Sequence, residues 1–333
     1  MTQVSASSNS QSPNSIHRLR QRLENGLIAA TPVPFDHSGK LHLPAHESYL
    51  RYMAQQPIAG VAVWAHTGRG LNLDKETAAK VLTDWRQALP QSVVIAGVGS
   101  RSAESVSATI DTVTMAETAV RLGADALLVY PPTWLRNGPT PDQLIVAHHK
   151  ELAQLGVPMI LFYLYEDAGG VSYSETVLGE LLDLPEVLGI KMATLDSVMT
   201  YQDVSRQITS QHPDKLLITG EDRFLGYSLQ RGARCALIGM GAICCELQAE
   251  LLRGNAEGNA SSFLELSNKV DHLAESLFIE PMEGYIQRLL WALVHLGVIP
   301  LDASHDPWGP SLPRDEFEAI GRTLDALMVV NQT

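Results

Sequence analysis

Short apolar runs recur along the chain from Gly26 onward, roughly every thirty residues, and each precedes a longer stretch with helical periodicity. The runs are continuous rather than alternating, which is typical of parallel strands covered on both faces. Eight runs have this form: GLIAATPV from Gly26, GVAVWA from Gly60, VVIAGVG from Val93, ADALLVY from Ala124, VPMILFYL from Val157, VLGIKMA from Val187, KLLITG from Lys215 and CALIGM from Cys235. The pattern predicts an α/β protein with a (β/α)₈ TIM barrel.

An open, doubly wound sheet is the structural rival of the barrel. Such a sheet would normally carry a glycine-rich dinucleotide fingerprint after its first strand, whereas this chain reads AATPVPF there. The barrel is therefore favoured. We expect residues 1–15, rich in Ser, Gln and Asn, to form a disordered tail. The barrel is expected over residues 16–245, and residues 246–333, rich in helix formers, are expected to form a helical C-terminal extension.

The overall charge is acidic, with 24 Lys and Arg against 37 Asp and Glu and a net charge of −13. This balance disfavours nonspecific binding to nucleic acid or to an anionic membrane, because both require clustered basic residues. No apolar run is long enough to span a bilayer, and no signal peptide is evident. The three cysteines, Cys235, Cys244 and Cys245, lack metal-ligand spacing, and no histidine pattern predicts a metal site. We expect a cytoplasmic protein without metal or cofactor.

Lys191 ends the apolar run VLGIK. In a TIM barrel the carboxyl ends of the strands form the active site, so a polar residue that ends an apolar run is a candidate for chemistry. Burial disfavours the charged form of lysine and leaves an amine that can attack a carbonyl. The alternatives are a lysine that snorkels to solvent or one that pairs with Asp196 or Glu221.

Tyr163 ends the preceding apolar run, 28 positions before Lys191. One βα unit separates the two residues, so their side chains are expected to converge at the barrel mouth. A phenol in that place can relay protons during imine formation and carbon–carbon cleavage. Tyr163 is alternatively a core aromatic with its hydroxyl at the rim, and the neighbouring aromatics Phe162 and Tyr165 leave the choice between these interpretations open.

The second run leads into AHTGRG, residues 65–70. Thr67 and Gly68 at a strand-to-helix turn offer a hydroxyl and backbone N–H groups that suit a carboxylate, and His66 or Arg69 could add charge. A Thr-Gly pair is also a common turn. In the eighth run, the glycines of ALIGMGA either let a ligand approach the backbone or only turn the chain. We take Ile238 and Gly239 there as candidate substrate contacts.

Together these segments resemble the dihydrodipicolinate synthase and N-acetylneuraminate lyase family of class I aldolases. The resemblance extends from TPVPFDHSGKL through IAGVGSRS, GADALLVYPP and GIKMATLD to ALIGMGA and LVHLGVIP. It implies a Schiff-base role for Lys191, a proton-shuttle role for Tyr163, and binding of the substrate's carboxylate by the turn of Thr67 and Gly68. It also implies that Thr67 is catalytic, because this turn links the tyrosine to water or substrate in the family. Tyr165, His66, Arg69, Ile238 and Gly239 are then expected to contact the substrate.

Three departures from the family pattern affect the expected specificity. The family's GTTGE turn is AHTGR here, so that His66 and Arg69 replace a threonine and a glutamate. The arginine that grips the second substrate in dihydrodipicolinate synthases is replaced by Ala168, and their paired tyrosines by the segment PPTW, residues 131–134. The resemblance therefore predicts a lyase or aldolase for pyruvate or a related 2-oxo acid, with a second substrate other than aspartate semialdehyde.

Two hypotheses of different classes follow. The first is an enzyme that makes or breaks a carbon–carbon bond, or dehydrates a sugar-derived 2-oxo acid, through Lys191. The second is a 2-oxo-acid-binding or structural protein that has kept the barrel and lost or altered catalysis. A metal-dependent barrel hydrolase is disfavoured. The partner implied by the resemblance is a second copy of the chain, in a dimer or tetramer, with Trp134 near the contact.

Overall fold

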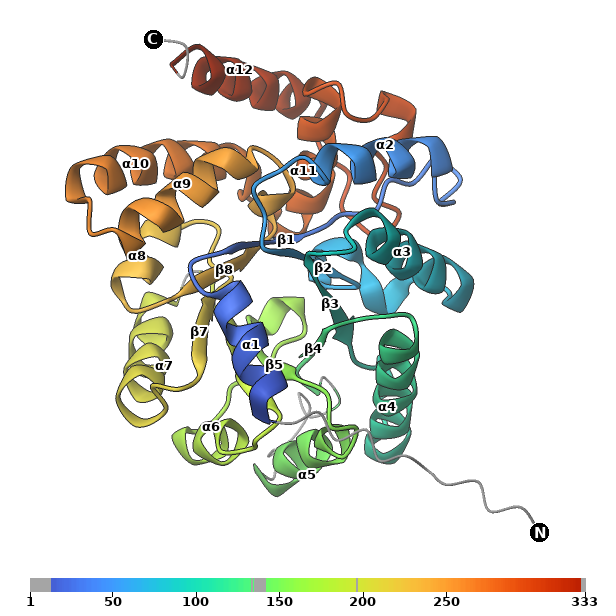
Figure 1. The fold of residues 1–333 in the computed structure, drawn as a ribbon. Helices are drawn as coiled ribbons and strands as arrows, with labels where there is room; N and C mark the ends of the chain where they lie inside the picture. Colours follow the sequence, from blue (N-terminus) through green and yellow to red (C-terminus); the bar gives the residue numbers. More distant parts are fainter. Residues whose placement is uncertain (1–12, 133, 135–141, 196, 331–333) are drawn as a thin grey trace.

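The computed structural model describes residues 13–132, 134, 142–195 and 197–330 of the 333-residue chain. Its eight strands form a closed parallel barrel in sequence order, in which β1 pairs with both β2 and β8. The predicted (β/α)₈ barrel is confirmed (Figure 1). The strands are β1 (Leu27–Ala30), β2 (Gly60–Val63), β3 (Val93–Val98), β4 (Ala126–Val129), β5 (Met159–Leu164), β6 (Val187–Ala193), β7 (Leu216–Thr219) and β8 (Cys235–Ile238).

A helix follows each strand and covers the outside of the barrel. Asp74 illustrates how the sequence starts such a helix, because its carboxylate accepts a hydrogen bond from the Thr77 amide in the first turn of α3. These helices are α2 (Leu43–Met53), α3 (Lys75–Ala88), α4 (Ser105–Arg121), α5 (Asp142–Ala153), α6 (Glu175–Leu182), α7 (Val198–Gln211), α8 (Leu225–Gln230) and α9 (Cys245–Ala256). Three more, α10 (Ala260–Leu277), α11 (Tyr285–His295) and α12 (Arg314–Val330), form the C-terminal extension.

The two ends of the chain differ in detail from the predicted boundaries. Helix α1 (Pro13–Leu23) begins within the segment expected to be a disordered tail, while residues 1–12 lie outside the described part. Its Leu19 and Leu23 join the apolar cluster of the barrel interior, so α1 closes the amino-terminal end of the barrel, as Figure 1 shows in blue. The boundary expected after residue 245 falls at the start of α9, which packs against β1.

Alternate residues of each strand face two separate apolar clusters. One cluster fills the barrel interior and includes Ile95, Phe162 and Ile218. The other lies between the barrel and its helices and includes Tyr163 and Met192. A strand residue's cluster therefore indicates whether its side chain points inward or outward.

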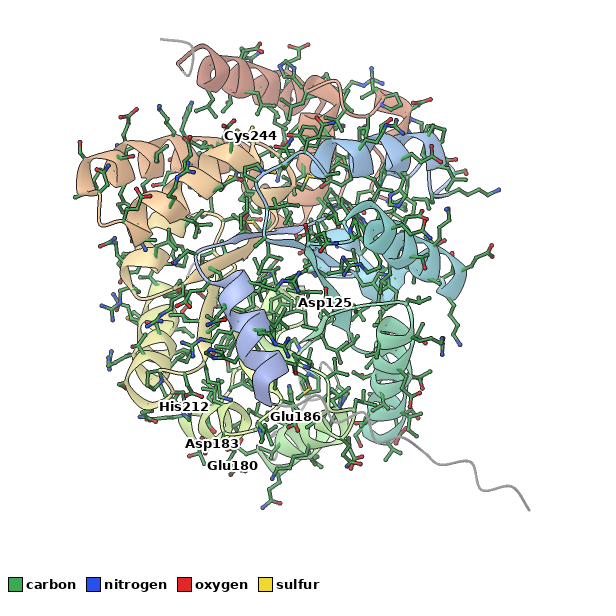
Figure 2. The ribbon with its side chains drawn as sticks, viewed as in Figure 1. Asp125, Glu180, Asp183, Glu186, His212 and Cys244 are labelled. Carbon is green, nitrogen blue, oxygen red and sulfur yellow. The ribbon has the colours of Figure 1, made fainter. Side chains whose placement is uncertain are left out.

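Polar contacts stabilise the amino-terminal pole of the barrel. The Asp125 carboxylate accepts hydrogen bonds from the Val94 amide and from Arg86, each at 2.9 Å. His212 lies 3.5 Å from Asp183 at the edge of the molecule (Figure 2). In a TIM barrel this pole is expected to stabilise the fold, because the active site lies at the opposite pole. Within the described residues, no helix combines the length and the apolarity needed to cross a bilayer.

Candidate active site

Lys191 lies on the inner face of the barrel. The strand register pairs it with Phe162 on β5 and Ile218 on β7, both of which belong to the interior cluster. Its Nζ lies 4.4 Å from the centre of the Phe162 ring, and the residue is 5% exposed. A Cβ on Gly220 would approach Lys191 Cε to 2.6 Å, so the glycine leaves room for the lysine side chain. The predicted burial of Lys191 is confirmed.

Burial lowers the pKa of Lys191 to about 8, although the nearby Asp222 and Glu221 act in the opposite direction. Glu221 does not form the ion pair considered from the sequence. Its carboxylate instead accepts hydrogen bonds from the Thr194 amide and hydroxyl, at 2.6 and 2.9 Å, and from the Leu195 amide. The other partner considered from the sequence, the residue at position 196, lies outside the described residues.

Asp222 follows the carboxyl end of β7, and its charge acts on Lys191. Its carboxylate accepts a hydrogen bond of 2.7 Å from the Met240 amide and a longer one of 3.4 Å from the Gly239 amide. Burial raises the pKa of Asp222 to about 6, against these hydrogen bonds and the charge of Lys191. The Gly239 amide therefore contacts the Asp222 carboxylate. Contact between Gly239 and a substrate stays a prediction.

Tyr163 does not converge with Lys191, and this prediction was wrong. Tyr163 pairs in register with Met192, belongs to the outer cluster, and packs edge-to-face on Tyr173 with ring centres 5.6 Å apart. Neighbouring strand residues point to opposite faces, so Phe162 is the residue that faces Lys191. The inner position for which the resemblance implied a phenol thus holds a phenylalanine.

An irregularity in the β5–β6 pairing explains the error. Met159 pairs with Val187, a separation of 28 positions, but the register shifts at the next residue and Ile160 pairs with Gly189, a separation of 29. A bulge of this kind changes which face each following residue occupies. Counting 28 positions back from Lys191 therefore selects an outward-facing side chain.

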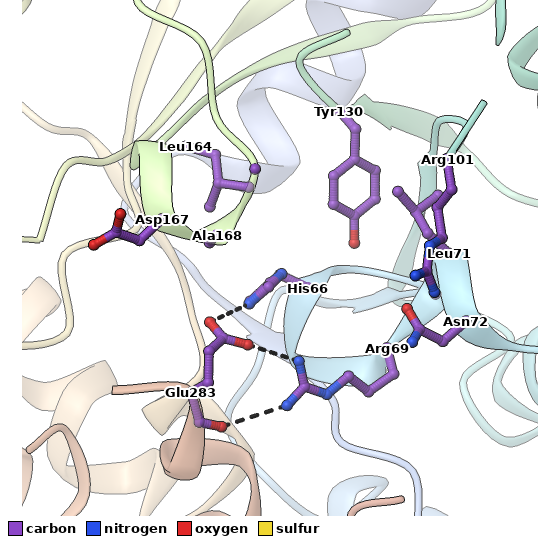
Figure 3. Close-up of a pocket in the computed structure, with 12 residues that line it drawn as sticks. His66, Arg69, Leu71, Asn72, Arg101, Tyr130, Leu164, Asp167, Ala168 and Glu283 are labelled. Atoms are coloured by element: carbon purple, nitrogen blue, oxygen red, sulfur yellow. Dashed lines mark hydrogen bonds and ion pairs between the residues drawn. The ribbon is translucent and has the colours of Figure 1, made fainter. Parts of the chain in front are cut away.

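A pocket of about 380 Å³ lies at the carboxyl ends of the strands (Figure 3). Its walls come from the loops after β2, β3 and β5, from the end of β4, and from the C-terminal extension. Tyr130 lines the pocket and contacts Phe162, with ring centres 5.6 Å apart. Phe162 in turn contacts Lys191 Nζ, so Tyr130 and Phe162 connect the pocket lining to the amine. The polar residues of its lining are His66, Arg69, Asn72, Arg101, Tyr130, Asp167 and Glu283.

Glu283 brings the C-terminal extension into the pocket. Its Oε1 accepts hydrogen bonds from Tyr165 at 2.6 Å and from His66 Nε2 at 2.8 Å, and its Oε2 pairs with Arg69 Nη1 at 2.7 Å. Burial alone would raise the pKa of Glu283, but these contacts bring it well below its ordinary value. Glu283 is therefore a carboxylate, and Figure 3 shows it between His66 and Arg69.

Arg69 is a link between the barrel and the C-terminal extension. Besides Glu283, its guanidinium contacts Asp306, with Nη2 at 2.7 Å from Oδ2 and Nε at 3.2 Å from Oδ1. Every guanidinium nitrogen has an acceptor, so Arg69 lines the pocket but its charge is already matched. In contrast, Arg101 is exposed, lines the same pocket, and has no ion-pair partner within the described residues.

Thr67 hydrogen-bonds to a residue that sequence reasoning missed. Its hydroxyl lies 3.1 Å from that of Tyr285, the first residue of α11. A Cβ on Gly239 would lie 3.1 Å from the Tyr285 ring and 3.4 Å from Thr67 Oγ1. Thr67, Gly239 and Tyr285 thus form one close-packed group. Ile238 points outward into the helix-facing cluster, so only its backbone remains available to a substrate.

The turn after β2 has an unusual backbone. Trp64 and Arg69 have φ angles of 55° and 50°, a region that costs a non-glycine residue on the order of 1–3 kcal/mol. The Trp64 carbonyl accepts a hydrogen bond from Tyr130 at 3.0 Å. A Cβ on Gly70 or Gly97 would lie 1.9 or 2.3 Å from that carbonyl oxygen, so both glycines are needed for the turn. Such strain is frequent at functional sites.

No group of three or more His, Cys, Asp or Glu side chains in the described parts of the chain has an arrangement that could hold a metal ion. The functional candidates missed from the sequence are Asp222, Glu283, Tyr285 and Asp306. The last three follow the barrel by more than forty residues, in segments without a recognisable motif. A local pattern could not assign them to the site.

The barrel holds a buried lysine on its inner face and a polar pocket at the carboxyl ends of its strands. This is the architecture of a TIM-barrel enzyme. Residues 23–326 match the dihydrodipicolinate synthetase family. The chain belongs to this family, which comprises lyases and aldolases. The resemblance inferred from the sequence is confirmed.

Individual relatives agree with this assignment. The chain is 29% identical to the 4-hydroxy-tetrahydrodipicolinate synthase of Ruegeria pomeroyi over 258 residues, which cover 77% of this chain and 84% of that protein. The dihydrodipicolinate synthase of Thermotoga maritima has the same fold, with a TM-score of 0.80 and 21% identity over 92% of this chain and 99% of that one. The N-acetylneuraminate lyase of Mycoplasma synoviae has it too, with a TM-score of 0.72 and 20% identity over 92% and 97% of the two chains.

Proposed function

We propose that this protein is a class I lyase or aldolase in which Lys191 forms a Schiff base with pyruvate or a related 2-oxo acid. The single observation that carries the proposal is the buried Lys191 amine, whose lowered pKa provides a neutral nucleophile near neutral pH. The imine then acts as an electron sink for the adjacent carbon. Neither a metal ion nor a cofactor has a part in this chemistry.

The turn of Thr67 and Gly68 is the proposed site for the carboxylate of the 2-oxo acid. The positive φ angles of Trp64 and Arg69 on either side of the turn support this role, because strained backbone clusters at active sites and ligand clamps. His66 and Tyr165 are proposed to contact the remainder of the substrate, and Gly239 to border it. Arg69 is proposed to hold the pocket together rather than to bind an anion, since its nitrogens are occupied.

The second substrate is proposed to differ from aspartate semialdehyde. Ala168 borders the pocket where an arginine would be needed, and an apolar methyl group cannot replace a charge-assisted pair. Arg101 lines the same pocket without an ion pair to any described residue, and it is proposed to select an anionic group elsewhere on the substrate. A screen of pyruvate with assorted aldehydes, and of sugar-derived 2-oxo acids in the cleavage direction, identifies the substrate.

Borohydride trapping tests the proposal. Pyruvate is incubated with the protein, sodium borohydride is added, and intact-mass and peptide analysis locate the adduct. An adduct on Lys191 that is absent from Lys191→Ala is expected, and Tyr163→Phe should trap to within about twofold of the wild type because that ring faces outward. Failure to trap pyruvate and other 2-oxo acids on folded protein would refute the Schiff base.

A second candidate function is a 2-oxo-acid-binding protein without turnover. The observation that favours it is Phe162, which cannot shuttle a proton at the position facing Lys191. This candidate predicts a trapped adduct and no catalysed reaction with any second substrate. Exchange of the pyruvate methyl protons in D₂O distinguishes this candidate from a catalytic lyase or aldolase.

The protein is proposed to act in the cytoplasm as a homo-oligomer. The support for self-association is an apolar groove between α4 and α5 that includes Trp134, Val106 and Ile110, the last two being 63% and 60% exposed. Exposed apolar surface of this kind favours a partner. Light scattering at micromolar concentration should give a dimer or tetramer, and a monomer would contradict the proposal.

A further inference from the structure

The position facing Lys191 lacks a proton-transfer group, so another residue must supply this function if the Schiff base supports turnover. Phe162 has no titratable atom. Tyr130 is committed as a donor to the Trp64 carbonyl, and Tyr165 as a donor to Glu283. Burial raises the pKa of both phenols, which disfavours the phenolate that would accept a proton.

We infer that His66, oriented by Glu283, is the base that moves the substrate proton at the carbon next to the Lys191 imine. The inference rests on the proposed Schiff base. His66 lines the pocket, with a side chain that is 17% exposed. Glu283 would be a positioning residue, because it acts through the imidazole. The C-terminal extension thereby completes an active site whose other residues come from the barrel.

The hydrogen bond to Glu283 determines which nitrogen of His66 is basic. Glu283 is ionised and can only accept, so His66 Nε2 is the donor in the 2.8 Å contact. In the neutral imidazole, the lone pair then resides on Nδ1, which forms no hydrogen bond with any residue that the structure describes. A carboxylate that holds one nitrogen protonated and leaves the other free is the arrangement of a general base.

One carboxylate and two phenols face the His66 ring. Glu283 is in direct contact, and the adjacent Arg69 is balanced by Asp306. The rings that face the imidazole from β5 and α11 are those of Tyr165 and Tyr285, at centroid distances of 6.5 and 6.3 Å. Both are uncharged phenols because burial raises their pKa. Asp167 also lines the pocket but is exposed to solvent, and it forms no hydrogen bond with His66 among the described residues.

The step transfers a proton from the protonated imine to His66. The C3–H bond of the bound pyruvate breaks, its electron pair forms the C=C bond of the enamine, and the C=N pair returns to the Lys191 nitrogen. The proton passes to His66 Nδ1. The reverse step returns a hydrogen to C3, and in D₂O this hydrogen is a deuteron. Pyruvate alone therefore reports on the step, without knowledge of the second substrate.

The test follows exchange of the pyruvate methyl protons in D₂O by proton NMR, across the pH range. The wild type should exchange them faster than free pyruvate. His66→Asn should slow the exchange by at least about 100-fold while pyruvate still traps on Lys191, because a positioned base contributes on the order of 10²–10⁴-fold. Added imidazole should partly restore exchange in His66→Ala.

Glu283→Gln separates a positioning role from a structural one. Replacement of the carboxylate by a neutral amide weakens the hydrogen bond that orients His66, so the exchange rate should fall by about tenfold or more while pyruvate still traps on Lys191. The conservative variant Glu283→Asp should keep more of the exchange rate. Mere damage to the pocket would lower trapping and exchange together. His295→Asn, in an exposed histidine–carboxylate pair with Asp325 on α11 and α12, is the matched control and should leave the exchange rate unchanged.

The outcomes separate this inference from the proposed function. If pyruvate does not trap on the wild type, the proposed Schiff base fails. If pyruvate traps and exchanges at the wild-type rate in His66→Asn, the Schiff base stands and the role of His66 is refuted. A wild-type exchange rate in Glu283→Gln, or a parallel loss of trapping and exchange, refutes the positioning role of Glu283.

Discussion

Asp222→Asn is predicted to increase the rate of imine formation near neutral pH. The negative charge of Asp222 raises the pKa of Lys191, against the larger effect of burial, so removal of the charge should lower that pKa further. With a pKa of about 8, roughly 9% of the amine is neutral at pH 7. A nearby opposite charge shifts a pKa by about one unit or more. If the pKa of Lys191 falls by about one unit, the neutral fraction of the amine at pH 7 rises to about half. The expected gain is about fivefold.

The assay measures the rate of borohydride-trapped adduct against pH by intact-mass spectrometry. The inflection of this profile should move to lower pH in Asp222→Asn, because asparagine keeps the acceptor for the Met240 amide but loses the charge. Asp203→Asn on the exposed face of α7 makes the same charge change at a distance and is the control. An inflection that stays in place or moves to higher pH would refute the electrostatic account of Lys191.

Two further predictions concern stability, measured by urea denaturation. Arg69→Met should lower the free energy of unfolding by about 3 kcal/mol, because it leaves the buried Asp306 unpaired, whereas Arg206→Met in an exposed pair should cost about 0.5 kcal/mol or less. Equal losses would show that the Arg69 contacts are not a structural link. Gly70→Ala should cost at least about 2 kcal/mol because its Cβ would meet the Trp64 carbonyl, while Gly179→Ala, in an open position of α6, should stabilise by about 0.5–1 kcal/mol. A neutral Gly70→Ala would contradict the close approach.

The barrel could be predicted from the sequence because its signal is local. Each buried parallel strand is a continuous apolar run, and Lys191 is conspicuous as a charged residue at the end of one. The inward position on β5 could not be predicted, because it depends on a register shift between two strands rather than on either strand's own pattern. An error of one position therefore selected Tyr163, whose side chain points out of the barrel, in place of the inward-facing Phe162.

The contacts of the C-terminal extension were beyond sequence reasoning for a different reason. Glu283 stands 217 positions after His66, and nothing in the short segment around it distinguishes it from an ordinary surface carboxylate. Arg69 was expected to contact substrate because it follows a Thr-Gly turn. Its role became apparent only when the fold placed two carboxylates around its guanidinium.

The ion pairs of Arg69 also bear on when the site can form during synthesis of the chain. Its partners lie 214 and 237 positions later, so the loop after β2 leaves the ribosome long before either carboxylate exists. Until then Arg69 has no counter-charge, and His66 lacks the acceptor that fixes its ring. Loop closure over such distances is entropically costly and comes late in folding. A nascent chain that has completed all eight strands should therefore remain inactive until translation has passed residue 306.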